Sequence, residues 1–281
     1  MVKEALESIH IRQERPEDYR AVEELTRETF WDKFWGLKQQ ICDEHLLVHK
    51  LRKTPSYVPE LDLVAEMAGT DKMNGKLVGH IIYTVSKIID DSGEAHEMLT
   101  FGPLSVHPDY YNKGIGKALM CHSFKIAKDM GYRAIIIFGH PDYYPRVGFK
   151  RAAEYGITTS DGKTFDPFMV YPLYDGALDG ISGRYYLDSV YETLTEEDAL
   201  KFDEQFPPKT RHTPAPIDVL LERLEPPARE VIKGLQCDTL ALMATKSERE
   251  ITALEGIDAN AISTISSVMR EHGRRWGTGK K

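Results

Sequence analysis

The chain has 281 residues, of which 41% are hydrophobic and 28% are charged, and its formal net charge is -8. This composition is ordinary for a globular protein, and the length suits one and a half to two domains. The acidic balance argues against a dedicated polyanion-binding protein. The three cysteines, Cys42, Cys121 and Cys237, have neither disulfide-framework nor zinc-site spacing, so a reducing compartment is expected.

The N-terminal stretch is charged throughout and lacks the apolar segment of a signal peptide. No stretch approaches the ~18 apolar residues that a membrane-spanning helix needs. The sequence also contains no internal repeat. We therefore expect a cytoplasmic protein that has no membrane partner.

The first part of the chain predicts alternating helices and strands. Apolar and polar residues alternate in the strands, and the helices have proline near their ends. Asn74-Gly75 is a turn signal between two β-branched runs, which predicts a hairpin. We expect a strand over 8–13, a helix from Pro16 to Phe30, a helix over 38–53, and hairpin strands over 61–64 and 76–89.

The middle of the chain holds the most informative pattern. Residues 99–106 predict a strand, but Gly102-Pro103 lies inside it, and proline cannot donate a ladder hydrogen bond. That strand should therefore be bulged or splayed. A turn at 107–109 and a glycine-containing loop follow, and then a helix over 115–130 and a buried strand over 133–138.

The last part of the chain divides into three stretches. Residues 149–190 are rich in strand and turn signals. The segment 206–216 (FPPKTRHTPAP) has little to bury and is the predicted linker. Residues 217–273 predict four or five short helices. The predicted domains are therefore 1–205 and 217–281, with 206–216 between them.

Gly114 and Gly116 lie between the broken strand and the following helix. Without a Cβ, the backbone can approach a ligand closely, and its N–H groups and the helix N-terminus can surround an anion such as a pyrophosphate. A nucleotide-triphosphate loop would need Ser or Thr after Lys117, where this chain has Ala118. A dinucleotide fingerprint would need glycine at Leu119. Neither alternative fits.

A third alternative fits these residues. The run LTFGPLSVHPDYYNKGIGKALM (99–120) resembles motif A of the GNAT acetyltransferases, and YYPRVGF (143–149) resembles the tyrosine-containing segment that follows it in the same family. The resemblance extends from about Ile9 to Gly183. PELDLVAE and GALDGISG resemble a bacterial subgroup of small acetyltransferases. One departure is Tyr111, where the family has Gln or Arg.

The resemblance implies an α+β fold, with a mixed, mostly antiparallel sheet, flanking helices and a splayed central strand. It also implies acetyl-CoA as co-substrate, no metal, and acetyl transfer by direct attack in a ternary complex. The acceptor would be the primary amine of a small molecule, or less readily of a protein, and homodimers are common in the family. The cofactor-binding residues implied are Leu104, Ser105, Val106, Tyr111, Asn112, Lys113, Gly114, Ile115, Gly116 and Lys117.

The resemblance also suggests catalytic groups. It places the Leu104 N–H against the acetyl carbonyl and Val106 beside the pantetheine arm. Tyr144 matches the family's general acid, because a phenol stays protonated at neutral pH and can donate to a thiolate; Tyr143 should face elsewhere. Glu97, near the start of the splayed strand, and His140, at the end of the central strand, are alternative general bases.

The acceptor site would draw on the N-terminal helices. Glu44 and His45 are candidates to line it, and Trp31 belongs to an aromatic cluster that would either wall it or pack in the core. Cys42 is expected to be a buried structural thiol rather than a nucleophile.

Residues 217–273 resemble the C-terminal domain of the bacterial RNA polymerase alpha subunit, including its helix-hairpin-helix. The family presents glycine and lysine to DNA phosphates where this chain has Asp258, Ala259 and Asn260. Because an aspartate repels phosphate, DNA binding is not expected. The preferred interpretation of this small all-α domain is a dimerisation or docking module. The alternative function is an acyl-CoA-sensing regulator whose C-terminal domain docks on DNA or a transcription protein.

Overall fold

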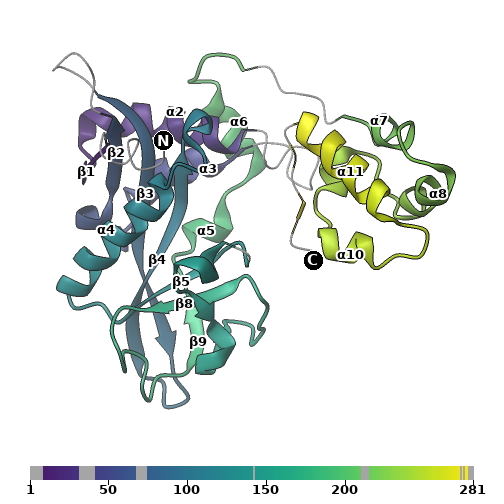
Figure 1. Ribbon diagram of the computed structural model, residues 1–281. Coiled ribbons are helices and arrows are strands. Elements are labelled where there is room, and N and C mark those ends of the chain that lie inside the picture. The colour runs from purple at the N-terminus through teal and green to yellow at the C-terminus, as the bar shows by residue number, and fades with distance from the viewer. Residues whose placement is uncertain are drawn as a thin grey trace. The chain divides into compact units, whose positions relative to one another are not determined.

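The computed structural model of this protein describes residues 9–31, 42–67, 75–141, 143–209, 215–272, 274 and 276–277 (Figure 1). The chain divides into two compact units. The first unit comprises residues 1–31 and 42–208, and the second comprises residues 32–41 and 209–281.

A nine-stranded sheet forms the centre of the first unit, in the order β1-β2-β3-β4-β5-β8-β6, with β9 pairing both β3 and β7. The β4–β5 and β7–β9 pairs are parallel and the other pairs are antiparallel, as predicted for a mixed sheet. The strands are β1 (Ile9–Gln13), β2 (Leu63–Met67), β3 (Lys76–Ile89), β4 (Ala95–Val106), β5 (Ala134–Phe138), β6 (Lys150–Arg151), β7 (Ile157–Thr159), β8 (Phe168–Pro172) and β9 (Gly183–Tyr186).

The predicted break in β4 is a bulge. Leu104 pairs with Ile81 and Phe101 with Tyr83, so two residues of β4, Gly102 and Pro103, lie opposite a single residue of β3. This arrangement bends the bulged strand locally.

Beside the bulge, β4 separates from β5. The two strands pair in parallel only at Leu99 and Ile135, near the start of β4. The remainder of β4, up to Val106, keeps its ladder to β3 and has none to β5. The predicted splay of the central strand is therefore present.

Helices cover both faces of the sheet (Figure 1). Helix α4 packs on one face through Ile115, Leu119 and Phe124. Helices α2, α3 and α5 pack on the other, where Val22, Val48 and Val190 meet the side chains of β2 and β3. The helices of this unit are η1 (Pro16–Asp18), α2 (Tyr19–Phe30), α3 (Glu44–Leu51), η2 (Pro59–Leu61), η3 (Pro108–Tyr110), α4 (Ile115–Asp129), η4 (Tyr144–Val147), η5 (Ala152–Tyr155), α5 (Val190–Thr193) and α6 (Glu196–Asp203).

Two predicted segments differ from the structure at their ends. The helix predicted over 38–53 is α3, which starts at Glu44; residues 38–41 lie outside the described part of the chain. The predicted linker starts with Phe206, yet Phe206 is buried and packs against Arg20, Phe202 and His45. An aromatic residue can join a core even inside a proline-rich stretch. Residues 210–214 of the linker are not described.

The second unit is helical and has its own core. Leu220, Ile232, Met243, Ile265 and Met269 are among its buried residues. Its helices are α7 (Asp218–Leu221), α8 (Pro226–Gly234), α9 (Leu240–Met243), α10 (Glu248–Thr252) and α11 (Ala259–Glu271). Across the described residues of both units, no helix is long and apolar enough to cross a membrane.

Candidate active site

The loop between β4 and α4 gathers backbone N–H groups. Asn112 has φ 61° and Gly114 has φ 83°, left-handed conformations that asparagine and glycine adopt most readily. Within the described chain, none of the N–H groups from 112 to 117 donates to another backbone or side-chain group, whereas Ala118 donates to the Gly114 carbonyl at 2.9 Å. Backbone donors of this kind at a helix N-terminus are suited to binding an anion.

Tyr111, the departure from the family pattern, holds this loop in place. Its hydroxyl donates to the backbone carbonyl of Thr29 on α2 at 3.1 Å. The side chain therefore ties the loop to the neighbouring helix, while the anion-facing groups remain backbone N–H donors. Lys113 lies over the Tyr110 ring at 4.5 Å, and Lys117 is exposed, so both place positive charge at the loop.

The end of β4 presents alternate residues to the splay. His107 donates its N–H to the Val78 carbonyl of β3 at 2.9 Å. Because N–H directions alternate along a strand, the N–H groups of Leu104 and Val106 point away from β3, to the side from which β5 has diverged. The geometry therefore presents two donors here.

Ser105 does not share this orientation. By the same alternation its N–H faces β3, and its fully buried side chain is bonded to the Thr26 hydroxyl of α2 at 3.0 Å. The prediction that Ser105 contacts the cofactor is therefore not supported by the geometry. Ile115, in the loop, likewise sends its side chain into the core, so only its N–H faces the anion side.

Tyr143 and Tyr144 begin the turn after β5, where the His140 carbonyl accepts both of their N–H groups at 3.0 and 3.2 Å. The Tyr144 ring lies against Gly139, where a Cβ would come within 2.3 Å of it. Burial, reinforced by the charges of Tyr143 and Glu44, raises the pKa of Tyr144 well above its usual value. The phenol therefore stays protonated at neutral pH, as a general acid requires.

Tyr143 faces the loop, contrary to expectation. A Cβ placed on Gly116 would lie 3.5 Å from the Tyr143 hydroxyl and 3.6 Å from the side chains of Leu104 and Val106. The turn after β5 thus brings a second tyrosine to the N-terminus of α4. Sequence spacing alone could not separate the directions of two adjacent tyrosines in a 3-10 turn.

Three residues from distant segments form what we call the tyrosine–glutamate cluster: Glu44, Tyr144 and Tyr191. Glu44 is half-buried at the N-terminus of α3. Burial raises the pKa of Tyr191, and the negative charge of Glu44 raises it further, as it does that of Tyr144. The charge of this carboxylate therefore acts on both phenols. Tyr191, on α5, was not predicted, and it stands in no recognisable motif.

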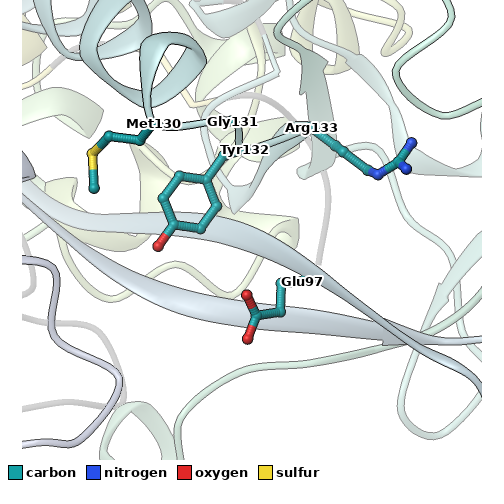
Figure 2. Close-up of a pocket in the computed structure, with 5 residues that line it drawn as sticks. All are labelled: Glu97, Met130, Gly131, Tyr132 and Arg133. Carbon is teal, nitrogen blue, oxygen red and sulfur yellow. The ribbon is translucent and has the colours of Figure 1, made fainter.

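Glu97 lies in the pocket that Figure 2 shows, away from the loop. It is exposed near the start of β4, in a shallow pocket with Met130, Gly131, Tyr132 and Arg133 at the C-terminal end of α4. Tyr132 points toward Glu97, whereas Arg133 extends away from it. Since the 15-residue helix α4 is about 22 Å long, Glu97 and the loop lie at opposite ends of the helix. The geometry does not support Glu97 as the general base.

The other predicted acceptor residues face the interior. His45 is fully buried between Phe202 and Phe206, and its Nε2 lies 3.2 Å from an Asp203 carboxylate oxygen. Trp31 is also buried, with the Arg27 guanidinium 4.3 Å above its ring. Both side chains therefore pack in the protein rather than line an acceptor site.

Two further predictions concern His140 and Cys42. His140 is exposed, and its observed role is to start the turn that carries Tyr143 and Tyr144. Cys42 is buried, as expected, and burial raises the pKa of its thiol to about 12. A thiol with that pKa is a poor nucleophile at neutral pH.

One buried group has metal-ligand residue types. Ligand atoms of Glu14, Asp62 and His80 lie within 4.8 Å of one another. Arg52 binds both oxygens of Glu14 at 2.9 and 2.6 Å, and Tyr57 and His80 each contact Asp62 at 2.8 Å. The atoms are thus engaged within an ion-pair network. Burial raises the pKa of Glu14 to about 8 and lowers that of His80 to about 4.

Comparison with known proteins agrees with this geometry. A model of the acetyltransferase (GNAT) family matches residues 13–150. The chain is 30% identical over 173 residues to YhbS of Escherichia coli K12, an uncharacterized N-acetyltransferase, across 62% of this chain and 92% of YhbS. It is 33% identical over 107 residues to the uncharacterized N-acetyltransferase YjhQ, across 38% of this chain and 55% of YjhQ.

A solved structure is similar over the same region. It is the E. coli GNAT family N-acetyltransferase YhbS in complex with CoA, with a TM-score of 0.56 and 26% identity. The similarity covers 67% of this chain and 94% of that one.

Proposed function

The chain belongs to the GNAT acetyltransferase family and is an acetyl-CoA-dependent acyltransferase, and on that premise we propose that its acceptor is the primary amine of a small molecule. The observation that carries the proposal is that the splayed strand β4 leads into an anion-binding loop and lies beside Tyr144, whose ring centroid is 6.0 Å from that of Phe101 on β4. Thioester and amine can then be brought together at one place.

The loop and β4 would hold acetyl-CoA. The N–H groups of residues 112–117 would bind the pyrophosphate, assisted by Lys113 and Lys117. Val106 would pair with the pantetheine arm, and the Leu104 N–H would donate to the thioester carbonyl. One positioned N–H donor facing a developing oxyanion is worth about 3 kcal/mol.

The cluster would serve the amine and the leaving group. Glu44 would attract the acceptor's ammonium group and take up its proton, directly or through water. The neutral nitrogen then attacks the carbonyl carbon, forming the C–N bond as the C–S bond breaks. Tyr144 would donate its proton to the departing thiolate, which leaves as the thiol of CoA. The second proton, which the nitrogen loses as it becomes an amide, would return through water to the Tyr144 phenolate.

Turnover tests this proposal. Thiol release from acetyl-CoA, measured over a panel of small amines, should identify acceptors, and Tyr144→Phe should abolish most of the release. Tight acetyl-CoA binding without turnover on any amine, together with salt-sensitive DNA binding, would contradict it and favour a regulatory protein.

We also propose that α10 and α11 form a helix-hairpin-helix that does not bind DNA. A capping box opens α10, since Ser247 and Glu250 bond each other's backbone N–H groups at 3.1 and 2.9 Å. At the start of α11, Asp258 accepts the Ala261 N–H at 2.7 Å. This carboxylate occupies one of the N–H donors that would face a phosphate and repels phosphate by its charge, which supports a docking or dimerisation role.

A further inference from the structure

Tyr191 contacts the bulge in β4 from outside the sheet. Its hydroxyl donates to the Gly102 carbonyl oxygen at 3.5 Å and lies 3.2 Å from the Thr84 hydroxyl, which can donate to it in turn. A ring carbon of Tyr191 lies 3.9 Å from the position of a Cβ on Gly102. Tyr191 lies beyond residues 13–150, which the family model matches.

Short helix α5 keeps Tyr191 in place. Its first residue, Val190, is buried in the core that α2 and α3 form on this face of the sheet. Asp188 accepts the Val190 N–H at 2.9 Å and the Ser56 hydroxyl at 2.6 Å. Ser56 in turn accepts the Val85 N–H at 2.7 Å through its carbonyl. A chain of contacts thus connects the Tyr191 backbone to β3.

The bulge needs such support. Gly102 and Pro103 together oppose one residue of β3, so the ladder does not determine the orientation of the Gly102 peptide. Glycine adds no side-chain packing, and proline adds no donor. Leu104 follows directly, and a change in the Gly102 peptide would be transmitted to the direction of the Leu104 N–H.

We propose that Tyr191 is a positioning residue that orients the Leu104 N–H toward the acetyl carbonyl by holding the Gly102 peptide. The inference rests on the proposed placement of the acetyl group at Leu104. It assigns a role in catalysis to the segment after the family-model region. Tyr191 acts through the backbone and touches neither substrate.

The test measures carbonyl polarisation in bound acetyl-CoA, which requires no known acceptor. Infrared spectra would be recorded for acetyl-CoA labelled isotopically at the thioester carbonyl, bound to the full chain. With the wild-type protein the carbonyl stretch should lie below its free value, because the N–H donor polarises the bond. In Tyr191→Phe it should return about half of the way to the free value, with Kd for acetyl-CoA changed by less than about twofold.

Two further variants make the result specific. Thr84→Val removes the hydroxyl that supports Tyr191 and should shift the stretch in the same direction, with no additional shift in the double variant. Tyr83→Phe removes a buried hydroxyl that bonds Ser123 at 2.7 Å on the α4 face, and should leave the stretch unchanged. Thermal unfolding of each variant checks that it is folded.

The possible failures can be told apart. A wild-type stretch equal to that of free acetyl-CoA would overturn the placement of the acetyl group, and the inference with it. A wild-type shift that persists unchanged in both Tyr191→Phe and Thr84→Val would overturn the positioning role alone. Once an acceptor is known, Tyr191→Phe should lower kcat about tenfold while leaving KM for acetyl-CoA unchanged.

Discussion

The cofactor side of the site is one continuous stretch of chain, whereas the tyrosine–glutamate cluster comes from three separate segments. Residues 104–117 supply mainly backbone N–H groups, and their positions follow from a bulge, two left-handed residues and a helix N-terminus. Glu44 and Tyr144 instead act on the reactants through side chains carried by α3 and η4, and Tyr191, on α5, acts through its contact with the Gly102 carbonyl. Changes on the first side should therefore alter cofactor binding, and changes on the second should alter turnover or acceptor binding.

The largest effect is expected at Tyr144. Tyr144→Phe should lower kcat by about 10²- to 10³-fold, because the thiolate loses its proton donor, and leave KM for acetyl-CoA within about twofold. Because the pKa of Tyr144 is raised well above its usual value, this group should cause no alkaline loss of kcat up to about pH 10. Steady-state kinetics from pH 6 to pH 10 measure both the fall in kcat of Tyr144→Phe and the pH dependence of kcat in the wild-type protein. A change confined to KM would assign Tyr144 to the cofactor side.

A side chain at Gly116 should produce the complementary result. In Gly116→Val the new methyl groups would meet the Tyr143 hydroxyl and the side chains of Leu104 and Val106. We expect Kd for acetyl-CoA to rise about 100-fold, or about 2.7 kcal/mol, by calorimetry. Gly234→Val is the matched control, because no atom lies within 4 Å of that Cβ position, and it should change Kd little. Equal Kd values for the two variants would be incompatible with cofactor binding at this loop.

Glu44→Gln tests the acceptor half of the comparison. Loss of the carboxylate should raise KM for a cationic amine about tenfold, measured with any acceptor that the amine panel identifies. Kd for acetyl-CoA should stay unchanged. Glu97→Gln, on β4 beside the C-terminal end of α4, should change neither KM for the amine nor Kd for acetyl-CoA. If Glu97→Gln had the larger effect, the acceptor would have to lie near the pocket of Figure 2.

The smallest effect concerns the ion-pair network behind the cofactor strand, where His80 lies opposite Ser105. The raised pKa of Glu14, about 8 against 4.5, means that the folded state holds a proton that the unfolded state releases. Stability should therefore fall as pH rises toward 8. The lowered pKa of His80, about 4 against 6.5, instead makes stability rise between pH 4 and 6.5.

Glu14→Gln should remove the decrease above pH 6.5, which amounts to about 1–2 kcal/mol between pH 6.5 and 8. Urea unfolding at a series of pH values measures this decrease in the free energy of unfolding. The exposed Glu60→Gln is the control and should keep the wild-type slope. An unchanged slope in Glu14→Gln would show that Glu14 ionises normally in the fold.

The contrast between the two sides also explains what the sequence could predict. The strand break at Gly102-Pro103, the loop and α4 follow from local rules on proline, glycine and helix termini, and the structure has all three. The direction of Leu104 and Val106 follows from strand alternation. The same alternation turns Ser105 the other way, and its side chain is bonded to Thr26, so its inclusion with them is not supported.

Side chains that meet across the fold were harder to predict. His45 and Glu44 are adjacent in sequence, yet His45 is buried against Phe202 and Phe206, whereas Glu44 is half-buried and its charge raises the pKa of Tyr144. Glu97 shares a strand with Leu104 but stands at its far end, a separation that depends on strand length and register. No sequence pattern marked Tyr191 as a site residue, because its proposed role depends on a contact with Gly102, 89 residues earlier.

The most direct test is a crystal structure of the protein with CoA and an amine that it acetylates. We predict that the pyrophosphate oxygens accept hydrogen bonds from N–H groups of residues 112–117, and that the thiol lies within reach of the Tyr144 hydroxyl with the amine beside Glu44. A pyrophosphate bound elsewhere, or a thiol directed away from Tyr144, would contradict this account.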